Sequence, residues 1–304
     1  MTRFFIMMGI VALLLVTSIA SVFAQPLEAP MWRGESGHYI IQASVNGQGP
    51  FNLAVDTGSV GTIFSAELIE ALELSPVPGA SENAYAAGGS VRFEFYDVES
   101  IGLGEGLLEN LRVVGSISSG ANIFDEEIQG ILGIDVIAEY VPAFLDSFET
   151  FRLLPTDTNL AHMTAGWINL EIRTAYGNLV FLDVMINGAS AAGVLDTGAS
   201  RNVMTYAAAQ AAGYTDGDAR IYDDPNGFNG MDGERMHSSN VDDVEIEWSG
   251  TALDPQTVSI ADLSVLSQLG LGDEAIIIGS PIFQGRDFVV DYQMNRILLA
   301  PKMD

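Results

Sequence analysis

Two copies of the triplet Asp-Thr-Gly, at residues 56–58 and 196–198, are the part of this sequence best suited to chemistry. Two carboxyl groups about 3 Å apart cannot both ionise, so they share one proton. The ionised member can deprotonate a water molecule, while the protonated member polarises a carbonyl group and later protonates the leaving nitrogen. Asp56 and Asp196 are therefore the predicted catalytic pair, and this chemistry needs no metal, no cofactor and no covalent intermediate.

The rest of each triplet has an expected supporting role. Gly58 and Gly198 allow the two loops to approach each other closely, because glycine has no side chain. The hydroxyl groups of Thr57 and Thr197 are expected to tie the loops together by crossed hydrogen bonds, which would fix the geometry of the carboxyl groups.

The residue after each triplet differs between the two copies. Ser59 is expected to hydrogen-bond the outer oxygen of Asp56, whereas Ala199 offers no hydroxyl to Asp196. This difference predicts that Asp56 ionises more readily and that Asp196 more often holds the shared proton, although the pair titrates as a unit.

A single Asp-Thr-Gly triplet is typical of an ordinary turn, but here it belongs to an internal duplication. Residues 45–58 and 186–198 each predict a strand, an Asn-Gly turn and a second strand that runs into the triplet. Further landmarks follow in the same order in both halves: an apolar-apolar-hydroxyl step (63–65 and 203–205), an apolar-apolar-glycine step (131–133 and 277–279), and two closing apolar segments (144–155 and 289–301).

These landmarks outline the elements that position the aspartates. Helices are predicted at 66–74 and 206–212, with Ser65 and Thr205 as N-caps. Short apolar runs broken by glycine predict strands at 91–98, 111–114, 179–186 and 244–248. The polar, proline-containing segment 155–165 is the expected linker, which divides the chain into an N-terminal lobe (25–155) and a C-terminal lobe (156–304).

The residues around both triplets, 55–59 and 195–200, together with the apolar-apolar-glycine steps, resemble the aspartic proteases and in particular the retropepsin-like group. The resemblance extends over most of residues 38–304 and is thin across 153–167 and 214–239. It implies a mostly-β fold of two similar β-barrel lobes, which form a pseudo-dimer with an active-site cleft between them. It also implies an aspartic endopeptidase that acts on peptides or proteins and, because one chain holds both aspartates, acts as a monomer.

Enzymes of this kind need a flap that covers the substrate. In the first lobe the glycine-tipped segment with Tyr85, Gly88 and Gly89, followed by a strand that contains Tyr96, is the candidate flap. Residues 226–233 are its counterpart in the second lobe. Both segments are also compatible with ordinary surface hairpins, and the sequence does not decide whether Tyr85 or Tyr96 contacts the substrate.

The composition disfavours several other functions. The chain has 40 acidic and 12 basic residues, and this net charge of −28 disfavours nucleic acid and anionic membranes as partners. It has no cysteine, which excludes disulfides and thiol chemistry. The sequence contains neither a Gly-x-Ser-x-Gly elbow nor a His-Glu-x-x-His motif. The three histidines, His38, His162 and His237, are scattered and expected at the surface, and the acidic segment 223–234 fits a solvated loop better than a calcium site.

Residues 1–24 have the features of a secretory signal, with Arg3 ahead of an apolar run and small residues before a cleavage site at Ala24-Gln25. The expected mature protein is periplasmic or secreted and has no stable association with a membrane. The alternative is an uncleaved membrane anchor. Two alternative functions also remain: a protein of the same fold that binds peptide or glycan without cutting it, and a processing protease with one physiological target.

Overall fold

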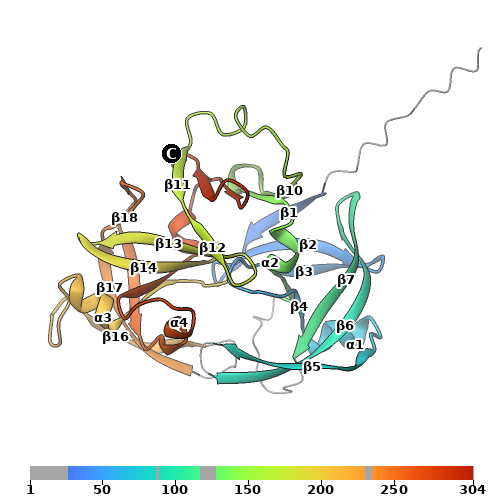
Figure 1. Ribbon diagram of the computed structural model, residues 1–304, viewed down its shortest axis with the longest axis horizontal. Helices are drawn as coiled ribbons and strands as arrows, with labels where there is room; N and C mark the ends of the chain where they lie inside the picture. Colours follow the sequence, from blue (N-terminus) through green and yellow to red (C-terminus); the bar gives the residue numbers. More distant parts are fainter. Residues whose placement is uncertain (1–26, 87–88, 117–127, 230–234, 304) are drawn as a thin grey trace, which may run out of the picture.

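The computed structural model describes residues 27–86, 89–116, 128–229 and 235–303, and most of its regular structure is β-strand (Figure 1). The predicted signal at 1–24 lies outside the described residues. The mostly-β fold with two similar lobes is confirmed, whereas the lobe boundary after residue 155 stays a prediction.

The strands of the N-terminal half are β1 (Leu27–Arg33), β2 (Tyr39–Val45), β3 (Gln48–Val55), β4 (Ile63–Phe64), β5 (Pro76–Ala86), β6 (Gly89–Leu103), β7 (Gly106–Ser116), β8 (Gly130–Leu132), β9 (Val141–Leu145) and β10 (Thr150–Leu154). Its helices are α1 (Ala66–Ala71), α2 (Ile134–Ile137) and the 3₁₀-helix η1 (Asp146–Phe148).

The strands of the C-terminal half are β11 (Ile168–Glu171), β12 (Arg173–Ala175), β13 (Leu179–Ile186), β14 (Ala189–Asp196), β15 (Asn202–Thr205), β16 (Tyr222–Asn229), β17 (Arg235–Val244), β18 (Ile246–Trp248), β19 (Thr251–Ala252), β20 (Gln256–Ala261), β21 (Ala275–Gly279), β22 (Phe288–Asp291) and β23 (Arg296–Leu299). Its helices are α3 (Tyr206–Ala211), α4 (Ser264–Gln268) and the 3₁₀-helix η2 (Ser280–Phe283).

The aspartate of each half follows the same arrangement of strands. β2 and β3 form an antiparallel hairpin in the first half, as β13 and β14 do in the second. The strand that leads to the aspartate also lies parallel to a short strand, β8 beside β3 and β21 beside β14. Because β8 and β21 carry the duplicated apolar-apolar-glycine step, the sequence repeat is also a structural repeat.

A closed barrel holds this arrangement in the N-terminal lobe. Its strand order is β2-β3-β8-β4-β7-β6, and β6 pairs back onto β2 through Ser44↔Gly102 and Val45↔Ile101. In the C-terminal lobe β18 pairs with β13 in the corresponding way. The buried residues of these strands pack into an apolar core that extends through both lobes and fixes the register of the strand before each aspartate.

The duplicated asparagines form the turns of the two hairpins. Asn46 and Asn187 both adopt the left-handed backbone conformation, with φ of 49° and 48°, which asparagine tolerates better than most residues. Their side-chain oxygens accept hydrogen bonds from the backbone of the neighbouring strand, Asn46 from Ser100 N (3.1 Å) and Asn187 from Glu245 N (3.0 Å). The repeated Asn-Gly pair therefore has the same structural role in both lobes.

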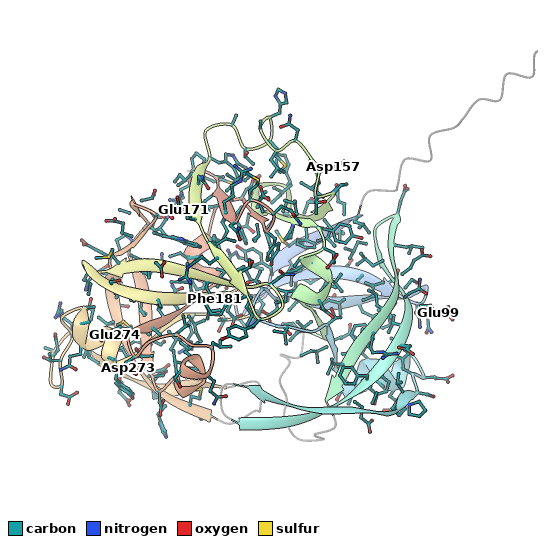
Figure 2. The ribbon with its side chains drawn as sticks, viewed as in Figure 1. Glu99, Asp157, Glu171, Phe181, Asp273 and Glu274 are labelled. Carbon is teal, nitrogen blue, oxygen red and sulfur yellow. The ribbon has the colours of Figure 1, made fainter. Side chains whose placement is uncertain are left out.

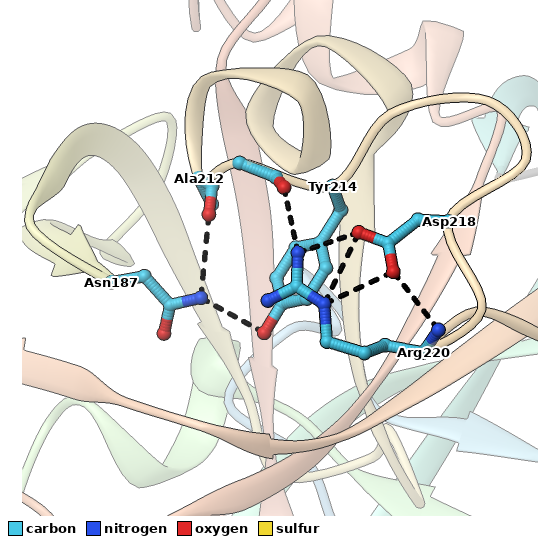
Figure 3. Close-up of polar contacts among 6 residues, drawn as sticks. Asn187, Ala212, Tyr214, Asp218 and Arg220 are labelled. Carbon is cyan, nitrogen blue, oxygen red and sulfur yellow. Dashed lines mark hydrogen bonds and ion pairs between the residues drawn. The ribbon is translucent and has the colours of Figure 1, made fainter.

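In the C-terminal lobe the same turn is also attached to the end of α3 (Figure 3). Asn187 Nδ2 donates to Tyr214 Oη (2.8 Å) and to Ala212 O (3.3 Å). Arg220 lies over the Tyr214 ring, 4.5 Å from its centroid, and pairs with Asp218. These contacts stabilise the outer end of the lobe.

The two predicted helices that follow the triplets are confirmed, with their N-caps. Ser65 Oγ accepts from Leu68 N (3.1 Å), and Thr205 Oγ1 accepts from Ala208 N (3.1 Å). Both helices end before the predicted residue, α1 by three residues and α3 by one. The reason is a reversal of the chain after each helix, where Glu73 and Gly213 take φ of 52° and 86°.

A six-stranded sheet joins the two halves, with β1, β10 and β9 from the first and β22, β23 and β11 from the second (upper part of Figure 1). The halves meet where β9 pairs with β22, through Phe288↔Phe144 and Val289↔Ala143. The rings of Phe144 and Phe288 stack with their centroids 4.3 Å apart. Both rings are fully buried, so the lobes share one continuous part of the core.

The two candidate flaps are hairpins, and β5 and β16 extend toward each other at the lower side of Figure 1. In the first hairpin Tyr85 pairs with Ser90 and Ala86 with Gly89, and residues 87–88, including Gly88, lie outside the described residues. In the second, β16 pairs with β17 as far as Asn229 and Arg235. The covering role of both hairpins stays a prediction.

Tyr96 does not belong to the tip of the first hairpin, and its role as a possible substrate contact stays a prediction. Its ring is only 8% exposed, and its hydroxyl donates to Glu94 (3.1 Å). Alternation along β6 places Tyr96 on the same buried face as Val98, while Asp97 between them is exposed. Tyr85 is therefore the aromatic residue whose backbone lies next to the tip.

The excess of acidic residues is carried by the surface. Figure 2 labels several of these exposed side chains, whereas Phe181, labelled in the same view, lies in the interior. The exposed acidic residues labelled in Figure 2 are Glu99, Asp157, Glu171, Asp273 and Glu274. Within the described parts of the chain, no helix has the length and apolar character to cross a membrane.

Candidate active site

The structure brings the two Asp-Thr-Gly loops together at the junction of the lobes, as the sequence predicts. The backbone N–H of each threonine donates to the hydroxyl of the other, Thr57 N to Thr197 Oγ1 and Thr197 N to Thr57 Oγ1, both at 3.0 Å. Each hydroxyl then donates across the junction to a backbone carbonyl, Thr57 to Leu195 O (3.2 Å) and Thr197 to Val55 O (2.7 Å). Both threonines are fully buried, so the crossed network holds the loops in one geometry.

The glycine of each triplet lies against the aspartate of the other lobe. A Cβ atom on Gly58 would lie 2.5 Å from Asp196 Cγ, and a Cβ on Gly198 would collide with the carboxylate of Asp56. Any larger residue at either position would push the two loops apart. The glycines are therefore required by the close approach of the two carboxyl groups.

The two carboxyl groups are held by matching backbone donors and by each other. Asp56 Oδ1 accepts from Gly58 N (2.7 Å) and Ser59 N (3.1 Å). Asp196 accepts from the backbone N–H groups of Gly198 and Ala199, and it is hydrogen-bonded to Asp56. Asp56 is 6% exposed, whereas Asp196 is half-buried.

The pKa of Asp196 lies well above its ordinary value. Burial is the largest cause, followed by the negative charge of Asp56 and the hydrogen bond between the two carboxyl groups. The two backbone donors to Asp196 act in the opposite direction but do not outweigh these causes. The raised pKa favours the protonated form of Asp196, and the assignment of the shared proton to one of the two carboxyl groups stays a prediction.

The cause that the sequence suggested for this difference is wrong. The Ser59 hydroxyl donates to Gly61 O (2.7 Å), and it is the backbone N–H of Ser59 that donates to Asp56. Ser59 therefore braces the loop internally, and its hydroxyl does not distinguish Asp56 from Asp196.

Two supporting residues, Thr62 and Asn202, were not predicted. Thr62 Oγ1 accepts from Gly133 N (3.2 Å) and donates to Asp135 Oδ1 (2.8 Å), while Asn202 Oδ1 accepts from Gly279 N (2.9 Å). Both side chains are fully buried and attach the catalytic loop to the apolar-apolar-glycine step. The available signal was their position, because each lies six residues after its aspartate.

His38 lies at the catalytic loop, which corrects its expected surface position; His162 and His237 are exposed. His38 Nε2 is 2.8 Å from Gly198 O. Because a carbonyl only accepts, Nε2 carries the proton of this bond, and Nδ1 faces Ser36 Oγ at 2.6 Å. His38 in the N-terminal lobe therefore holds the loop that carries Asp196.

A tyrosine below the junction is the other unpredicted neighbour of the pair. Tyr292 is 7% exposed, and its hydroxyl has no hydrogen-bond partner among the described residues. Burial raises the pKa of Tyr292, and the charge of Asp56 raises it further. The phenol is thus a neutral group in the surroundings of Asp56.

No group of three or more potential metal ligands occurs in the part of the chain that the structure describes. In the acidic segment 223–234, Asp224 pairs with Arg201 (2.6 Å) and accepts from Ser238 (3.0 Å), while residues 230–234 lie outside the described residues. The arrangement at Asp56 and Asp196 has the two kinds of carboxyl group, one able to accept and one able to donate a proton, that acid–base chemistry requires.

Comparison with known families agrees with this geometry. The model of a family described as aspartyl protease matches residues 41–136 and 182–281, which together make up more than half of the chain. Each match lies in one half and contains one Asp-Thr-Gly triplet. No curated protein matches the chain in sequence.

Proposed function

Because the chain belongs to the aspartyl protease family, with one matching region in each half, we propose that it is an endopeptidase that uses Asp56 and Asp196 together. The observation that carries the proposal is the crossed network of Thr57 and Thr197. If the two triplets were only turns, the fold would not require that their loops be buried, hydrogen-bonded to each other and arranged with their carboxyl groups in contact. Two carboxylates that repel each other give a purely structural junction no advantage.

In the proposed reaction Asp56 is the base and Asp196 the acid. Asp56 takes a proton from the attacking water while Asp196, which holds the shared proton, hydrogen-bonds the carbonyl oxygen of the scissile peptide bond. The tetrahedral intermediate collapses when Asp196 transfers its proton to the leaving nitrogen. The proton that Asp56 took from the water then becomes the shared proton, so the pair returns to its starting state.

The test is cleavage of a diverse mixture of denatured peptides by the purified chain across pH 3 to 7, with products identified by mass spectrometry. Asp196→Asn is compared with the wild type. We expect cleavage by the wild type and a loss of about 10⁴-fold or more in the variant, because one member of a mutually dependent pair is removed. Equal cleavage by both proteins would refute the proposed roles.

If folded wild-type protein cleaves nothing at any pH, the two alternatives gain support. A binding protein would retain peptide or glycan without cutting it, and a processing protease would cut only its own target. Both would be pursued by cross-linking the folded protein to its partners.

We also propose that the protein works outside the cytoplasm, after removal of residues 1–24 at Ala24-Gln25. The support for this is the apolar run with its Val-x-Ala site and the absence of cysteine. N-terminal sequencing of the protein that accumulates in cells tests the proposal. A chain that begins at Met1 and remains in the membrane fraction would favour the anchor.

A further inference from the structure

A polar cavity of about 830 Å³ begins next to the loop that carries Asp196. Ser200 and Arg201, which come after Ala199 in the loop that follows the triplet, form one wall. Asn240 and Ser259 from the sheet, and Lys302 near the C-terminus, form others. The mechanism described above uses none of these side chains.

The cavity gathers basic residues in a protein that has few of them. Arg201 and Lys302 line it, and Arg286 pairs with Asp254 in its wall, so three of the 12 basic residues in the chain meet here. Two acidic residues, Asp224 and Asp254, lie in the lining. The lining therefore holds two cations and two carboxylates, so the charges in the cavity balance although the molecule as a whole carries a charge of −28.

Arg201 keeps hydrogen-bond donors available for a ligand. Its Nη1 makes the contacts with Asp224 (2.6 Å) and Ser259 (3.5 Å). In the described part of the chain, Nε and Nη2 have no hydrogen-bond partner, and the side chain is 33% exposed. One guanidinium group can thus hold the buried Asp224 and still bind a second carboxylate.

Lys302 on the opposite wall is the second cation with solvent access. Its ammonium group lies 3.0 Å from Asp254, which it shares with Arg286 (3.3 Å), and 54% of its side chain is exposed. Asp242 borders the cavity by accepting from Thr257 Oγ1 (2.7 Å). An anionic ligand therefore has its best partner in Arg201, on the wall next to the catalytic loop.

The corresponding positions of the N-terminal lobe are apolar. Ile63 and Val203 hold equivalent positions after the two aspartates. Ile63 pairs with Val114 in the first lobe, and Val203 pairs with Ser259 in the second. The next residue across the sheet is Phe95 in the first lobe and Asn240 in the second. The same fold thus presents an apolar surface on one side of the catalytic pair and a polar one on the other.

The loops after the triplets differ in the same sense. Val60, which is 59% exposed, stands where the second lobe has Ser200, and Gly61 stands where it has Arg201. Arg201 therefore has no counterpart across the pseudo-symmetry. These differences, in the loops after the triplets and on the strands beside them, point to unequal demands of the ligand on the two sides.

We propose that the cavity beside Arg201 is a subsite for an acidic side chain of the peptide substrate, so that the enzyme prefers glutamate or aspartate at one fixed distance from the scissile bond. This inference rests on the proposed function and specifies its substrate. Arg201 is the specificity-determining residue, because it offers a carboxylate two N–H groups in a planar arrangement. Lys302 adds attraction without fixing orientation.

The cut sites of the peptide mixture test the proposal directly. We expect one position relative to the scissile bond to be enriched in glutamate or aspartate over glutamine or asparagine. A matched pair of peptides with Glu or Gln at that position should differ in kcat/KM by about tenfold or more at pH 6. The preference should fall toward pH 3.5 as the glutamate side chain, with a pKa near 4.3, becomes protonated.

Variants separate the role of Arg201 from an effect on folding. Arg201→Gln alone removes one charge of the ion pair with Asp224. The decisive variant is therefore the double substitution Arg201→Gln/Asp224→Asn, which removes both charges and retains an acceptor for Ser238. We expect it to cleave the Glu and Gln peptides at nearly equal rates. The control is Arg173→Gln. Arg173 on β12 forms an exposed ion pair with Asp183 on β13, so this variant loses the same charge elsewhere and should still prefer the Glu peptide.

The outcomes distinguish the subsite from the proteolytic function. Cleavage without acidic enrichment at any position, or a preference that survives in the double variant, overturns the subsite and leaves the protease intact. If no peptide is cleaved, the subsite is tested by NMR titration with acetyl-triglutamate amide against acetyl-triglutamine amide. Shifts at Ser200 and Arg201 with the first peptide only, absent in the double variant, support it; no shifts with either peptide overturn it.

Discussion

At the residue scale, the unequal surroundings of the two aspartates govern both chemistry and stability. A carboxyl whose pKa is higher in the folded than in the unfolded chain binds its proton more tightly when folded. Its ionisation therefore opposes folding, and the penalty develops as the pH rises from about 3.8 through the raised pKa of Asp196. The geometry that prepares the site for acid catalysis thus lowers stability at neutral pH.

Asp196→Asn should accordingly be more stable than the wild type at pH 7, with a higher melting temperature, although we expect it to be inactive. Asparagine has no charge to bury, so the difference should shrink as the pH falls toward 3.5. Thermal unfolding across this pH range measures it, with Asp157→Asn at an exposed position as the control. A variant less stable than the wild type at pH 7 would show that ionisation of Asp196 does not destabilise the folded protein.

His38 gives a second prediction at this scale. His38→Ala removes the donor to Gly198 O and should lower kcat by about 10- to 100-fold through displacement of the Asp196 loop, with little change in KM. His38→Gln, which retains an N–H donor on a side chain of similar reach, should restore much of the loss. Equal activity in the wild type and His38→Ala would mean that the threonine network alone positions the loop.

At the element scale, both lobes cap the helix after the triplet with a hydroxyl side chain, but the cap in the second lobe makes more hydrogen bonds. Ser65 caps α1 through one hydrogen bond. Thr205 caps α3 in the same way, but its hydroxyl also donates to Asp273 O (2.6 Å) and accepts from Ala275 N (3.2 Å) at the start of β21. The second cap therefore also fixes the strand that lies beside the catalytic β14.

Ser65→Ala should cost about 1 kcal/mol in the free energy of unfolding, as is usual for loss of an N-cap. Thr205→Ala should cost more, because it also leaves a backbone donor and a backbone acceptor without their partner. Urea unfolding of the two variants measures the difference. A smaller loss for Thr205→Ala would mean that β21 is held by its strand pairings alone.

The elements that sequence predicted correctly are those whose signals are local. The caps at Ser65 and Thr205 depend on contacts three residues away, and so they follow from the sequence. The bond from Thr62 to Asp135 spans 73 residues, and that from His38 to Gly198 spans 160. Such contacts depend on how the barrels close, which the repeat alone does not specify.

At the scale of the whole molecule, a shared sheet connects the two lobes through the pairing of β9 with β22. Phe288 lies at its centre and stacks on Phe144 of the other half and on Phe283 of its own. Removing it would leave a cavity against both lobes. Asp56 lies on a loop of the first half and Asp196 on a loop of the second, so the distance between their carboxyl groups depends on the two halves staying joined.

Phe288→Ala should lower the free energy of unfolding by about 3–5 kcal/mol, and the wild type should unfold in a single transition. The control is Phe148→Ala, because Phe148 is 70% exposed and should contribute little. Denaturant unfolding followed by fluorescence and by circular dichroism provides the measurement. Two separate wild-type transitions would show that the lobes unfold independently despite the shared sheet.

The pairing of β9 with β22 also has a consequence for synthesis. When the ribosome has completed β9, its partner is still more than 140 residues away in the sequence, so a folded first half would carry an open strand edge with the apolar sequence Val-Pro-Ala-Phe-Leu. Such an edge invites pairing with another chain. Since Phe288↔Phe144 and Val289↔Ala143 are related by the pseudo-two-fold axis, β9 of a second nascent chain matches this edge nearly as well as β22. We therefore expect truncated first halves to associate in pairs. We also expect the intact chain to mispair least when it folds only after both halves have been made.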